Sequence, residues 1–350
     1  MIKKQVKSKK SKVNHLRGTF YCLILFTFAF LLLPFNSIAQ ESNKKPKIGL
    51  VLSGGGAKGL AHIGVLKVID SLGIKIDYIG GTSMGAIVGG LYASGYTGKQ
   101  LDSIFKTLQF DDLVQDNIPR KSKLLFNKRN DDIYALSLPF KKLKLETPNA
   151  LSKGFYNYNF LSKLTYHARN TRDFKKLPIP FFCMATDIET GEEIILNKGI
   201  FPQALIASSS VPSIFYPIEI EGRLLVDGGV TNNYPVEKLK ELGAEYIIGV
   251  DVQEELKDRN ELQGITTIFG QISNFNTQSQ MKSKRQLTNI YIKPEIKGYS
   301  VLSFENGKKI IENGEHATRN FLPELLKFEN KAYQKSELKP VKDSIFIGNI

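Results

Sequence analysis

Residues 76–93 read IDYIGGTSMGAIVGGLYA, and this stretch indicates the fold more directly than any other part of the chain. Ile76–Ile79 is a short apolar run of the kind expected for a buried strand. Ala86–Ala93 is rich in small and apolar residues, which is typical of a closely packed helix. Between them, Gly81-Thr82-Ser83-Met84-Gly85 has the G-x-S-x-G pattern, in which a serine on a sharp strand-to-helix turn exposes its hydroxyl. The stretch therefore predicts a strand–turn–helix unit with Ser83 as a candidate nucleophile.

The serine motif has two interpretations. In an acyl hydrolase, the helix N-terminus behind Ser83 favours the negative charge that develops at the acyl oxygen during attack on an ester. In a protein without this chemistry, the same small residues simply allow a tight turn between a strand and a helix. The pentapeptide alone does not distinguish the two, so the interpretation depends on the other motifs.

A glycine-rich loop follows another apolar run. Ile48–Leu52 predicts a buried strand, and residues 53–59 read SGGGAKG. Glycines allow positive φ and close approach of backbone N–H groups to a ligand, so the loop is suited to binding an anion. The loop also satisfies the dinucleotide-binding pattern G-x-G-x-x-G, with Asp77 near the offset of the acidic residue. It is not a Walker A loop, because a glycine follows Lys58.

The third motif is Asp227-Gly228-Gly229, which follows the apolar run Leu224–Val226. An aspartate at the carboxyl end of a strand can point into the crevice where α/β proteins bind ligands, although Asp-Gly is also a common turn. A dinucleotide-binding protein needs neither this aspartate nor the serine motif. An acyl hydrolase uses all three motifs, as oxyanion donors, nucleophile and base. We therefore predict an acyl hydrolase, with a Rossmann-type nucleotide-binding protein as the alternative from another class.

Histidine is the alternative base. An α/β-hydrolase triad runs in the order Ser…Asp…His, and His316 falls in that order, although far downstream in a weakly patterned segment. His62 lies on the helix predicted after the glycine loop, and His167 lies in an aromatic region. We interpret all three as structural or exposed residues. Cys183 lies in an apolar run, where a buried structural thiol is expected rather than a nucleophile.

The spacing of the apolar runs predicts an α/β fold. Strands are expected at residues 48–52, 76–79, 181–186, 193–196 and 246–252, and helices at 60–72, 86–93, 201–208 and 236–242. The alternation indicates a sandwich with a mostly parallel sheet, because parallel strands are buried on both faces and appear as continuous apolar runs. We expect a catalytic core over residues 47–253, with a polar and aromatic cap or insertion at 110–160. Residues 254–350 are predicted to form a separate basic C-terminal extension.

These motifs resemble those of the patatin-like phospholipase family. Three blocks match: GGGAKG at residues 54–59, GTSMG at 81–85 and DGG at 227–229. A further stretch, ASSSVPSIF at 207–215, resembles the family's Ala-Ser-x-x-Ile/Val-Pro-x-x-Phe segment. The resemblance covers residues 47–252 in the family's order and spacing. It implies a three-layer α/β/α sandwich.

The resemblance also implies roles for individual residues. The family uses a Ser–Asp dyad without histidine, so Ser83 would attack the ester carbonyl and Asp227 would take its proton. Backbone N–H groups of the glycine loop would hold the oxyanion, namely those of Gly54, Gly55 and Gly56. Lys58, where the family usually has Arg or Lys, would contact the substrate. The implied substrate is a phospholipid or lysophospholipid, with transfer of the acyl group to an alcohol as the alternative to hydrolysis.

No metal or organic cofactor is expected. The sequence has no His/Cys cluster with zinc spacing and no Asp-rich calcium loop.

The first 39 residues predict a cleavable signal peptide. Seven basic and no acidic residues precede the apolar run Phe20–Leu33, and the small-residue site Ser37-Ile38-Ala39 follows it. An uncleaved anchor is the alternative, but the run is shorter than a membrane span of roughly 20 residues. We expect cleavage after Ala39 and a polar linker at residues 40–46. The mature protein would then lie in the periplasm or at the periphery of the outer membrane, or be secreted.

Charge limits the range of partners. The chain has 48 basic and 34 acidic residues, a net charge of +14, and loss of the seven basic signal residues leaves +7. A modest positive excess suits contact with an anionic membrane surface, or simply solubility. Nucleic-acid binding is not expected, because no basic residues are concentrated in a patch. A hydrophobic content of 42% fits a globular protein rather than a polytopic membrane protein. The sequence makes no prediction about oligomeric state.

The last ten residues read VKDSIFIGNI and alternate like a strand. They resemble the opening of a polypeptide-transport-associated domain, which some exported patatin-like proteins carry before an outer-membrane β-barrel. We expect either a free-standing enzyme with a vestigial tail or a truncated sequence. An ordinary closing strand is the alternative.

Overall fold

The computed structural model describes residues 45–108, 140–141, 144–145, 152–263, 265–330 and 333. Four predictions lie wholly or mostly outside these residues: the signal peptide at 1–39, the linker at 40–46, the cap at 110–160 and the terminal strand pattern at 341–350. The central sheet and the helices around it belong to one compact unit that begins at Pro46.

The sheet has eight strands, most of them short and apolar. They are β1 (Ile48–Leu52), β2 (Tyr78–Thr82), β5 (Phe181–Asp187), β6 (Glu193–Leu196), β7 (Ile218–Ile220), β8 (Arg223–Asp227), β9 (Tyr246–Val250) and β10 (Ile290–Ile292). A separate two-stranded hairpin consists of β3 (Phe140–Lys141) and β4 (Lys144–Leu145).

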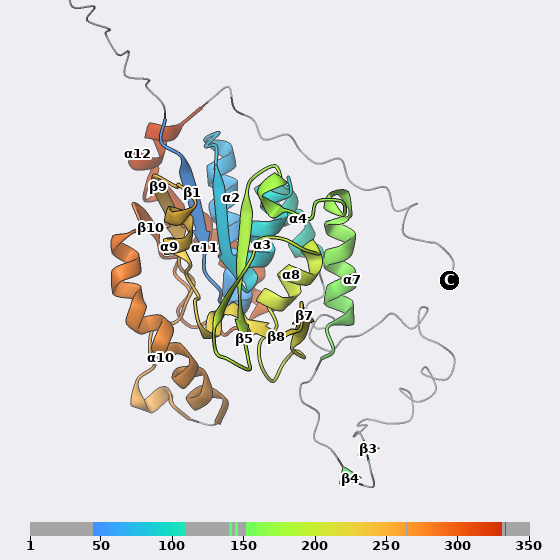
Figure 1. Cartoon of the computed structure of the whole chain (residues 1–350). Helices are drawn as coiled ribbons and strands as arrows, with labels where there is room; N and C mark the ends of the chain where they lie inside the picture. The colour runs from blue at the N-terminus through green and yellow to red at the C-terminus, as the bar shows by residue number, and fades with distance from the viewer. Residues whose placement is uncertain are drawn as a thin grey trace, which may run out of the picture. The chain divides into compact units, whose positions relative to one another are not determined.

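Helices connect the strands (Figure 1). They are α2 (Ala61–Ser71), α3 (Met84–Ala93), α4 (Gly98–Thr107), α7 (Phe155–Leu164), α8 (Phe201–Ser208), α9 (Val236–Glu241), α10 (Ile265–Gln286), α11 (Gly307–Arg319) and α12 (Leu322–Leu325). Short 3-10 turns used below are η1 (Gly56–Leu60), η5 (Gly228–Val230), η7 (Phe304–Asn306) and η8 (Leu326–Phe328).

The strand order is β10-β9-β1-β2-β5-β8-β7, with β6 paired to β5. The five strands from β10 to β5 are parallel, whereas β8, β7 and β6 run antiparallel to their neighbours. The predicted α/β fold with a mostly parallel central sheet is confirmed. Because β1 and β2 are parallel neighbours, the loops that follow them meet at one edge of the sheet.

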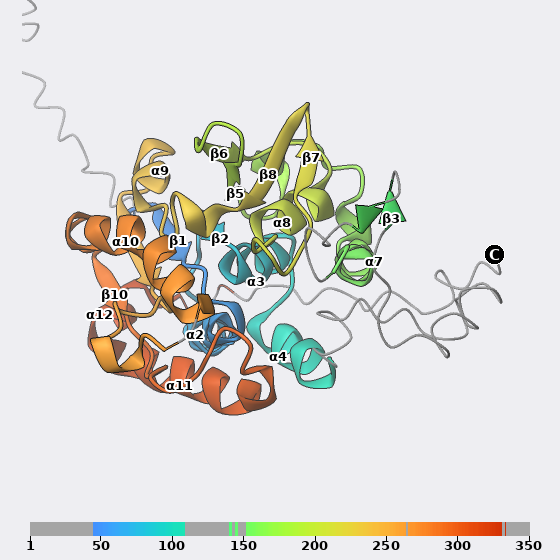
Figure 2. The same ribbon diagram turned by 90° about the horizontal axis from the view of Figure 1, so that it is seen from below.

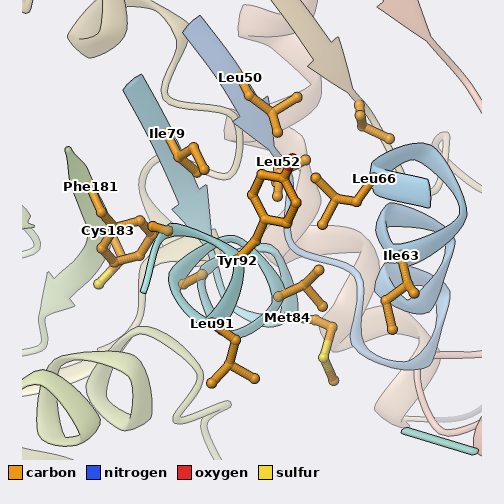
Figure 3. Packing of buried hydrophobic residues seen from close by; sticks show 14 of the residues in the cluster. Leu50, Leu52, Ile63, Leu66, Ile79, Met84, Leu91, Tyr92, Phe181 and Cys183 are labelled. Atoms are coloured by element: carbon orange, nitrogen blue, oxygen red, sulfur yellow. The ribbon is translucent and has the colours of Figure 1, made fainter. Parts of the chain in front are cut away.

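Helices cover both faces of the sheet, which gives three layers. Alternate residues of β1 face opposite sides: Leu50 and Leu52 join a large core cluster with α2, α3, α8 and α11, and Val51 joins a smaller cluster with α9 and α10. Figure 2 shows α2, α3 and α11 on one side of the strands and α9 on the other. In Figure 3, Leu66 of α2 and Tyr92 of α3 lie near Leu52 of β1, in the same core cluster. Burial on both faces explains why the parallel strands are continuous apolar runs.

The core extends further along the chain than the sequence predicted. It was expected to end near residue 253, but β10 pairs with β9 and continues the parallel sheet. Helix α11 packs on α2, where Gly64 and Gly314 allow the closest approach: a Cβ on either glycine would lie 2.0 Å from a backbone carbonyl oxygen of the other helix. The sequence gives little sign of this, because β10 is only three residues long and α11 has few large apolar residues.

Two further elements, β2 and α4, differ from the sequence prediction. Strand β2 covers Tyr78–Thr82 rather than residues 76–79, so Gly80 and Gly81 lie in the strand instead of a loop. A Cβ on Gly80 would lie 2.5 Å from the ring of Phe182, so glycine there permits close packing of neighbouring strands. Helix α4 was not predicted, although Thr97 and Gln100 form a capping box at its start.

Candidate active site

Ser83 occupies the strand-to-helix turn that its motif predicts. Strand β2 ends at Thr82 and α3 begins at Met84, and Ser83 itself has φ 56° and ψ −125°. A positive φ is uncommon for a residue with a Cβ, and such conformations cost about 1–3 kcal/mol where they are retained. The flanking glycines make the turn possible. A Cβ on Gly81 would lie 2.5 Å from the Gly85 carbonyl oxygen, and a Cβ on Gly85 would lie 2.3 Å from the Leu52 carbonyl oxygen.

Sheet register brings Asp227 to the level of Ser83. Thr82 of β2 pairs with Met184 of β5, so Ser83 lies level with Ala185, the next residue of β5. On the other side of β5, Ala185 pairs with Asp227, the last residue of β8. Because β8 runs antiparallel to β5, its carboxyl end reaches the site from the opposite direction to β2.

The carboxylate of Asp227 is buried and only partly satisfied. Its Oδ1 accepts a hydrogen bond from the Gly229 N–H at 2.7 Å, whereas Oδ2 has no hydrogen-bond partner among the described residues. Burial raises the pKa of Asp227 to about 6, and the Ser83 hydroxyl and the Gly229 N–H act against this rise. Because Oδ2 accepts no hydrogen bond among the described residues, the Ser83 hydroxyl lies near the carboxylate but is not aligned as its donor. The arrangement can accept a proton from that hydroxyl.

The glycine loop lies against Ser83. A Cβ on Gly54 would lie 2.9 Å from the Ser83 Cβ. The Gly54 N–H donates to Asn233 Oδ1 at 3.0 Å, so it is already occupied. The N–H groups of Gly55 and Gly56 donate to no group in the part of the chain that the structure describes. Of the three predicted oxyanion donors, the geometry therefore leaves two available.

A sequence model of the patatin-like phospholipase family matches residues 50–240, which include the glycine loop, Ser83 and Asp227. The chain belongs to this family. The curated relatives include a patatin-like phospholipase domain-containing protein of Caenorhabditis elegans, 30% identical over 80% of this chain and 21% of its own length. The lysophospholipase NTE1 of Saccharomyces cerevisiae is 27% identical over 82% of this chain and 17% of its own length. The chain thus spans about a fifth of the length of these relatives.

Among solved structures, VipD from Legionella pneumophila is similar over 82% of this chain and 67% of its own chain, with 16% identity and a TM-score of 0.41.

Two serines at the end of α8 hold the two candidate catalytic residues of this patatin-like chain. Ser208 Oγ accepts a hydrogen bond from the Ser83 N–H at 3.1 Å. The carbonyl oxygen of Ser210 accepts one from the Asp227 N–H at 2.9 Å. Both serines lie in the segment that resembles the family motif, although the sequence alone did not indicate these contacts.

Asn233 belongs to the site although no sequence motif indicated it. Its side chain lies between the glycine loop and the Asp227 loop: Oδ1 accepts from the Gly54 N–H, and a Cβ on Gly229 would lie 3.0 Å from the same oxygen. Its neighbour Asn232 is held by a buried cation, because Lys284 of α10 donates to Asn232 Oδ1 at 2.7 Å. Neither asparagine lies in one of the recognised motifs, so no sequence signal pointed to them.

Lys58 lies in a buried ion pair. Its ammonium is 2.7 Å from Glu254 Oε1, and the side chain is only 2% exposed. Burial lowers the pKa of Lys58, and the ion pair with Glu254 opposes that effect. The predicted contact of Lys58 with substrate stays a prediction. The observed contact anchors the end of the glycine loop to the segment after β9.

The described histidines make other contacts. His62 Nε2 is 2.8 Å from the Ser53 carbonyl oxygen, and burial lowers the pKa of His62 to about 4. His167 Nε2 is 3.0 Å from the Ser94 carbonyl oxygen, and His316 is exposed in the last turn of α11. Among the described residues, no histidine hydrogen-bonds to Ser83 or Asp227, which favours the dyad over a triad. The expectation for Cys183 is confirmed, since the thiol is fully buried and burial raises its pKa to about 12.

Asp77 does not fit the alternative of a dinucleotide site. Its carboxylate accepts the Ile48 N–H at 2.9 Å and lies 3.3 Å from the Lys75 ammonium. It precedes β2, at the amino ends of the parallel strands, whereas the glycine loop follows the carboxyl end of β1. In a dinucleotide fold the acidic residue must reach the ribose beside the glycine loop.

Within the described ranges, no cluster of three His, Cys, Asp or Glu side chains is arranged to hold a metal ion. In the same ranges, none of the helices combines the length and the apolar character needed to cross a membrane.

Proposed function

We propose that this chain is a serine lipid-acyl hydrolase that cleaves acyl esters of phospholipids or lysophospholipids with Ser83 and Asp227. The observation that carries the proposal is the buried Asp227 carboxylate beside the hydroxyl of a serine held at positive φ. Among the residues that the structure describes, Asp227 Oδ2 has no hydrogen-bond partner. Membership of the patatin-like phospholipase family and the names of the lysophospholipase relatives support a lipid ester as substrate.

The geometry suits a two-step reaction. Asp227 accepts the hydroxyl proton of Ser83 while Oγ attacks the ester carbonyl carbon, and the N–H groups of Gly55 and Gly56 stabilise the oxyanion. The carbonyl re-forms, the bond to the alcohol breaks, and Asp227 returns the proton to the departing alkoxide. Water then attacks the acyl-serine by the same route and releases a fatty acid. If an alcohol replaces water in this second step, the same site is an acyltransferase.

The experiment compares ester hydrolysis by three variants. Ser83→Ala and Asp227→Asn should each remove nearly all activity towards a lysophospholipid and a p-nitrophenyl ester, because members of one catalytic unit fail together. His316→Ala is the control and should retain full activity. A correctly folded Ser83→Ala variant with wild-type hydrolysis would refute the proposal, and a large loss in His316→Ala would favour a triad.

We also propose that the chain is exported and acts at a membrane surface. The proposal rests on the basic and apolar N-terminal pattern and on the positive charge left after residue 39. N-terminal sequencing of the protein from its native envelope should begin at Gln40. A start at Met1 or Ile2 would instead indicate an uncleaved segment.

A further inference from the structure

A groove of about 350 Å³ lies beside the end of η1, between the end of α4 and the start of α11. Its floor is apolar and buried, with Leu60, Phe105 and Ile311 at most 5% exposed. Its rim is more polar and includes Lys308, but it also carries Leu302, whose side chain is 52% exposed. Water at such a floor finds few hydrogen-bonding partners, whereas Lys106, Glu305 and Lys308 offer charged groups around it, so the groove is suited to an apolar ligand with a polar end.

The groove shares a wall with the 3-10 turn that follows the proposed oxyanion donors, although neither Gly55 nor Gly56 lines it. Leu60 is the last residue of η1, which starts at Gly56. On the other wall, Leu302 follows Val301, whose carbonyl oxygen accepts the Ala57 N–H at 2.9 Å. The two segments that form the near end of the groove therefore also fix the backbone of the glycine loop. An acyl chain whose ester carbonyl is held at Gly55 and Gly56 would therefore pass along η1 to reach the groove.

We propose that this groove binds one acyl chain of the substrate, with the ester carbonyl at the glycine loop and the chain running between α4 and α11. This inference rests on the proposed function. The volume is at the lower end of the roughly 300–1,000 Å³ typical of ligand cavities, which favours one chain over two. A single-chain ester such as a lysophospholipid therefore fits the site better than a diacyl lipid.

The test changes Leu302, which is exposed on the rim, and measures kcat/KM for p-nitrophenyl palmitate and p-nitrophenyl butyrate. Leu302→Asp puts a carboxylate in the path of a long chain, so the palmitate-to-butyrate ratio of kcat/KM should fall by about 10-fold or more, given that one methylene in a pocket is worth 10–200-fold. Butyrate, which extends only a short way into the groove, should lose much less. Leu302→Trp narrows the groove without adding charge and should reduce the same ratio.

Leu326→Asp is the matched control. Leu326 is 48% exposed, close to the value for Leu302. It is the first residue of η8, whose last residue, Phe328, packs against the ring of Tyr246 at the start of β9. That is the end of the sheet opposite the glycine loop. The palmitate-to-butyrate ratio of this variant should equal that of the wild type, and thermal unfolding of all variants should show that they fold.

Binding of the fluorescent fatty acid cis-parinaric acid separates this inference from the proposed function. If the wild type hydrolyses neither ester, the proposed function fails, but weaker fatty-acid binding by Leu302→Asp than by Leu326→Asp would still support the groove. An unchanged ester ratio together with unchanged fatty-acid binding in both Leu302 variants overturns the inference. A drop in the unfolding temperature of Leu302→Asp with neither ligand affected also overturns it, since the groove would then be covered by another part of the chain.

Discussion

The Asp227 side chain favours the proposed chemistry at the expense of stability. Its carboxylate is 6% exposed, and one of its oxygens is without a hydrogen-bond partner among the described residues. Burial of an unpaired charge disfavours the ionised form, which is why the pKa of Asp227 is raised to about 6. A base with this pKa is ionised at neutral pH and still accepts a proton readily.

We predict that Asp227→Asn abolishes activity and stabilises the fold at pH 8. The pKa of about 6 in the folded state lies above the ordinary value of 3.8, so the ionised carboxylate destabilises the folded state at neutral and alkaline pH. The gain should be at most about 3 kcal/mol, since each pKa unit corresponds to about 1.4 kcal/mol. It should shrink as the pH falls through about 6 and vanish below about 4, where the wild-type carboxyl is protonated in both states. Urea unfolding at pH 8 and pH 4 measures this, and a variant less stable than the wild type at pH 8 would contradict it.

Asn233 is expected to position the glycine loop rather than to contact substrate. Asn233→Ala removes the side-chain acceptor of the Gly54 N–H and leaves only the Asn233 carbonyl oxygen, at 3.4 Å, so the loop should lose its alignment with Asp227. We expect kcat to fall by about 10- to 100-fold with a much smaller change in KM, because small displacements of catalytic groups have effects of this size. Steady-state kinetics on a soluble ester measures the two constants.

The control for Asn233 is Asn289→Ala. Asn289 Oδ1 also accepts a backbone hydrogen bond, from the Ile247 N–H at 2.8 Å, but Ile247 lies near the amino end of β9, away from the site. This variant should lose a similar amount of stability, about 1 kcal/mol, and keep its kcat. Equal loss of kcat in both variants would mean that Asn233 has only a structural role.

At the scale of elements, the glycine loop and η1 are confined between two other segments. A Cβ on Gly55 would lie 2.8 Å from the Val252 carbonyl oxygen, and one on Gly56 would lie 2.4 Å from that of Val301. The loop therefore depends on the segment after β9 and on the segment before η7. These close backbone contacts help to hold the N–H groups of Gly55 and Gly56 in place.

We predict that Gly56→Ala reduces kcat by about 100-fold or more, comparable to removal of one oxyanion donor. Gly56 has φ +55°, so the added Cβ is strained and must also displace Val301. Gly191→Ala is the control, because Gly191 has φ +74° but nothing within 4 Å of the added Cβ. Both variants should lose about 1–2 kcal/mol of stability from the left-handed backbone, and Gly56→Ala should lose more because it must displace Val301. Unfolding measures both losses, and only Gly56→Ala should lose activity. Full activity of Gly56→Ala would show that the loop does not hold the oxyanion.

At the scale of the whole molecule, the sequence predicted the parts of the fold that depend on local pattern. Strand β1 and helix α8 have the bounds that their apolar runs predict, and the serine turn forms as its motif indicates. The antiparallel direction of β8 was not predictable, because direction depends on pairing with β5 across the sheet. Likewise β10 and α11 gain their place in the core from partners far away in the chain.

The candidate site shows the same difference between local motifs, which the sequence reveals, and long-range contacts, which it does not. The sequence pointed to Ser83 and Asp227 because each belongs to a contiguous motif. Ser208 and Ser210 accept the backbone hydrogen bonds of these two residues, and Asn233 holds the neighbouring Gly54. These contacts join residues far apart in the chain, so no local motif indicates them. Tertiary contacts likewise explain why the Gly54 N–H is already occupied and why Lys58 is buried with Glu254.

The most direct measurement of the central claim is the mass of the protein after reaction with a fluorophosphonate, which labels activated serines. We predict a single adduct on the peptide that contains Ser83, formed at a rate that rises with pH through about 6 as Asp227 ionises. Ser83→Ala should show no adduct, and Asp227→Asn should react far more slowly at every pH. An adduct on another residue, or labelling of Asp227→Asn at the wild-type rate, would contradict the assignment of Ser83 and Asp227 as nucleophile and base.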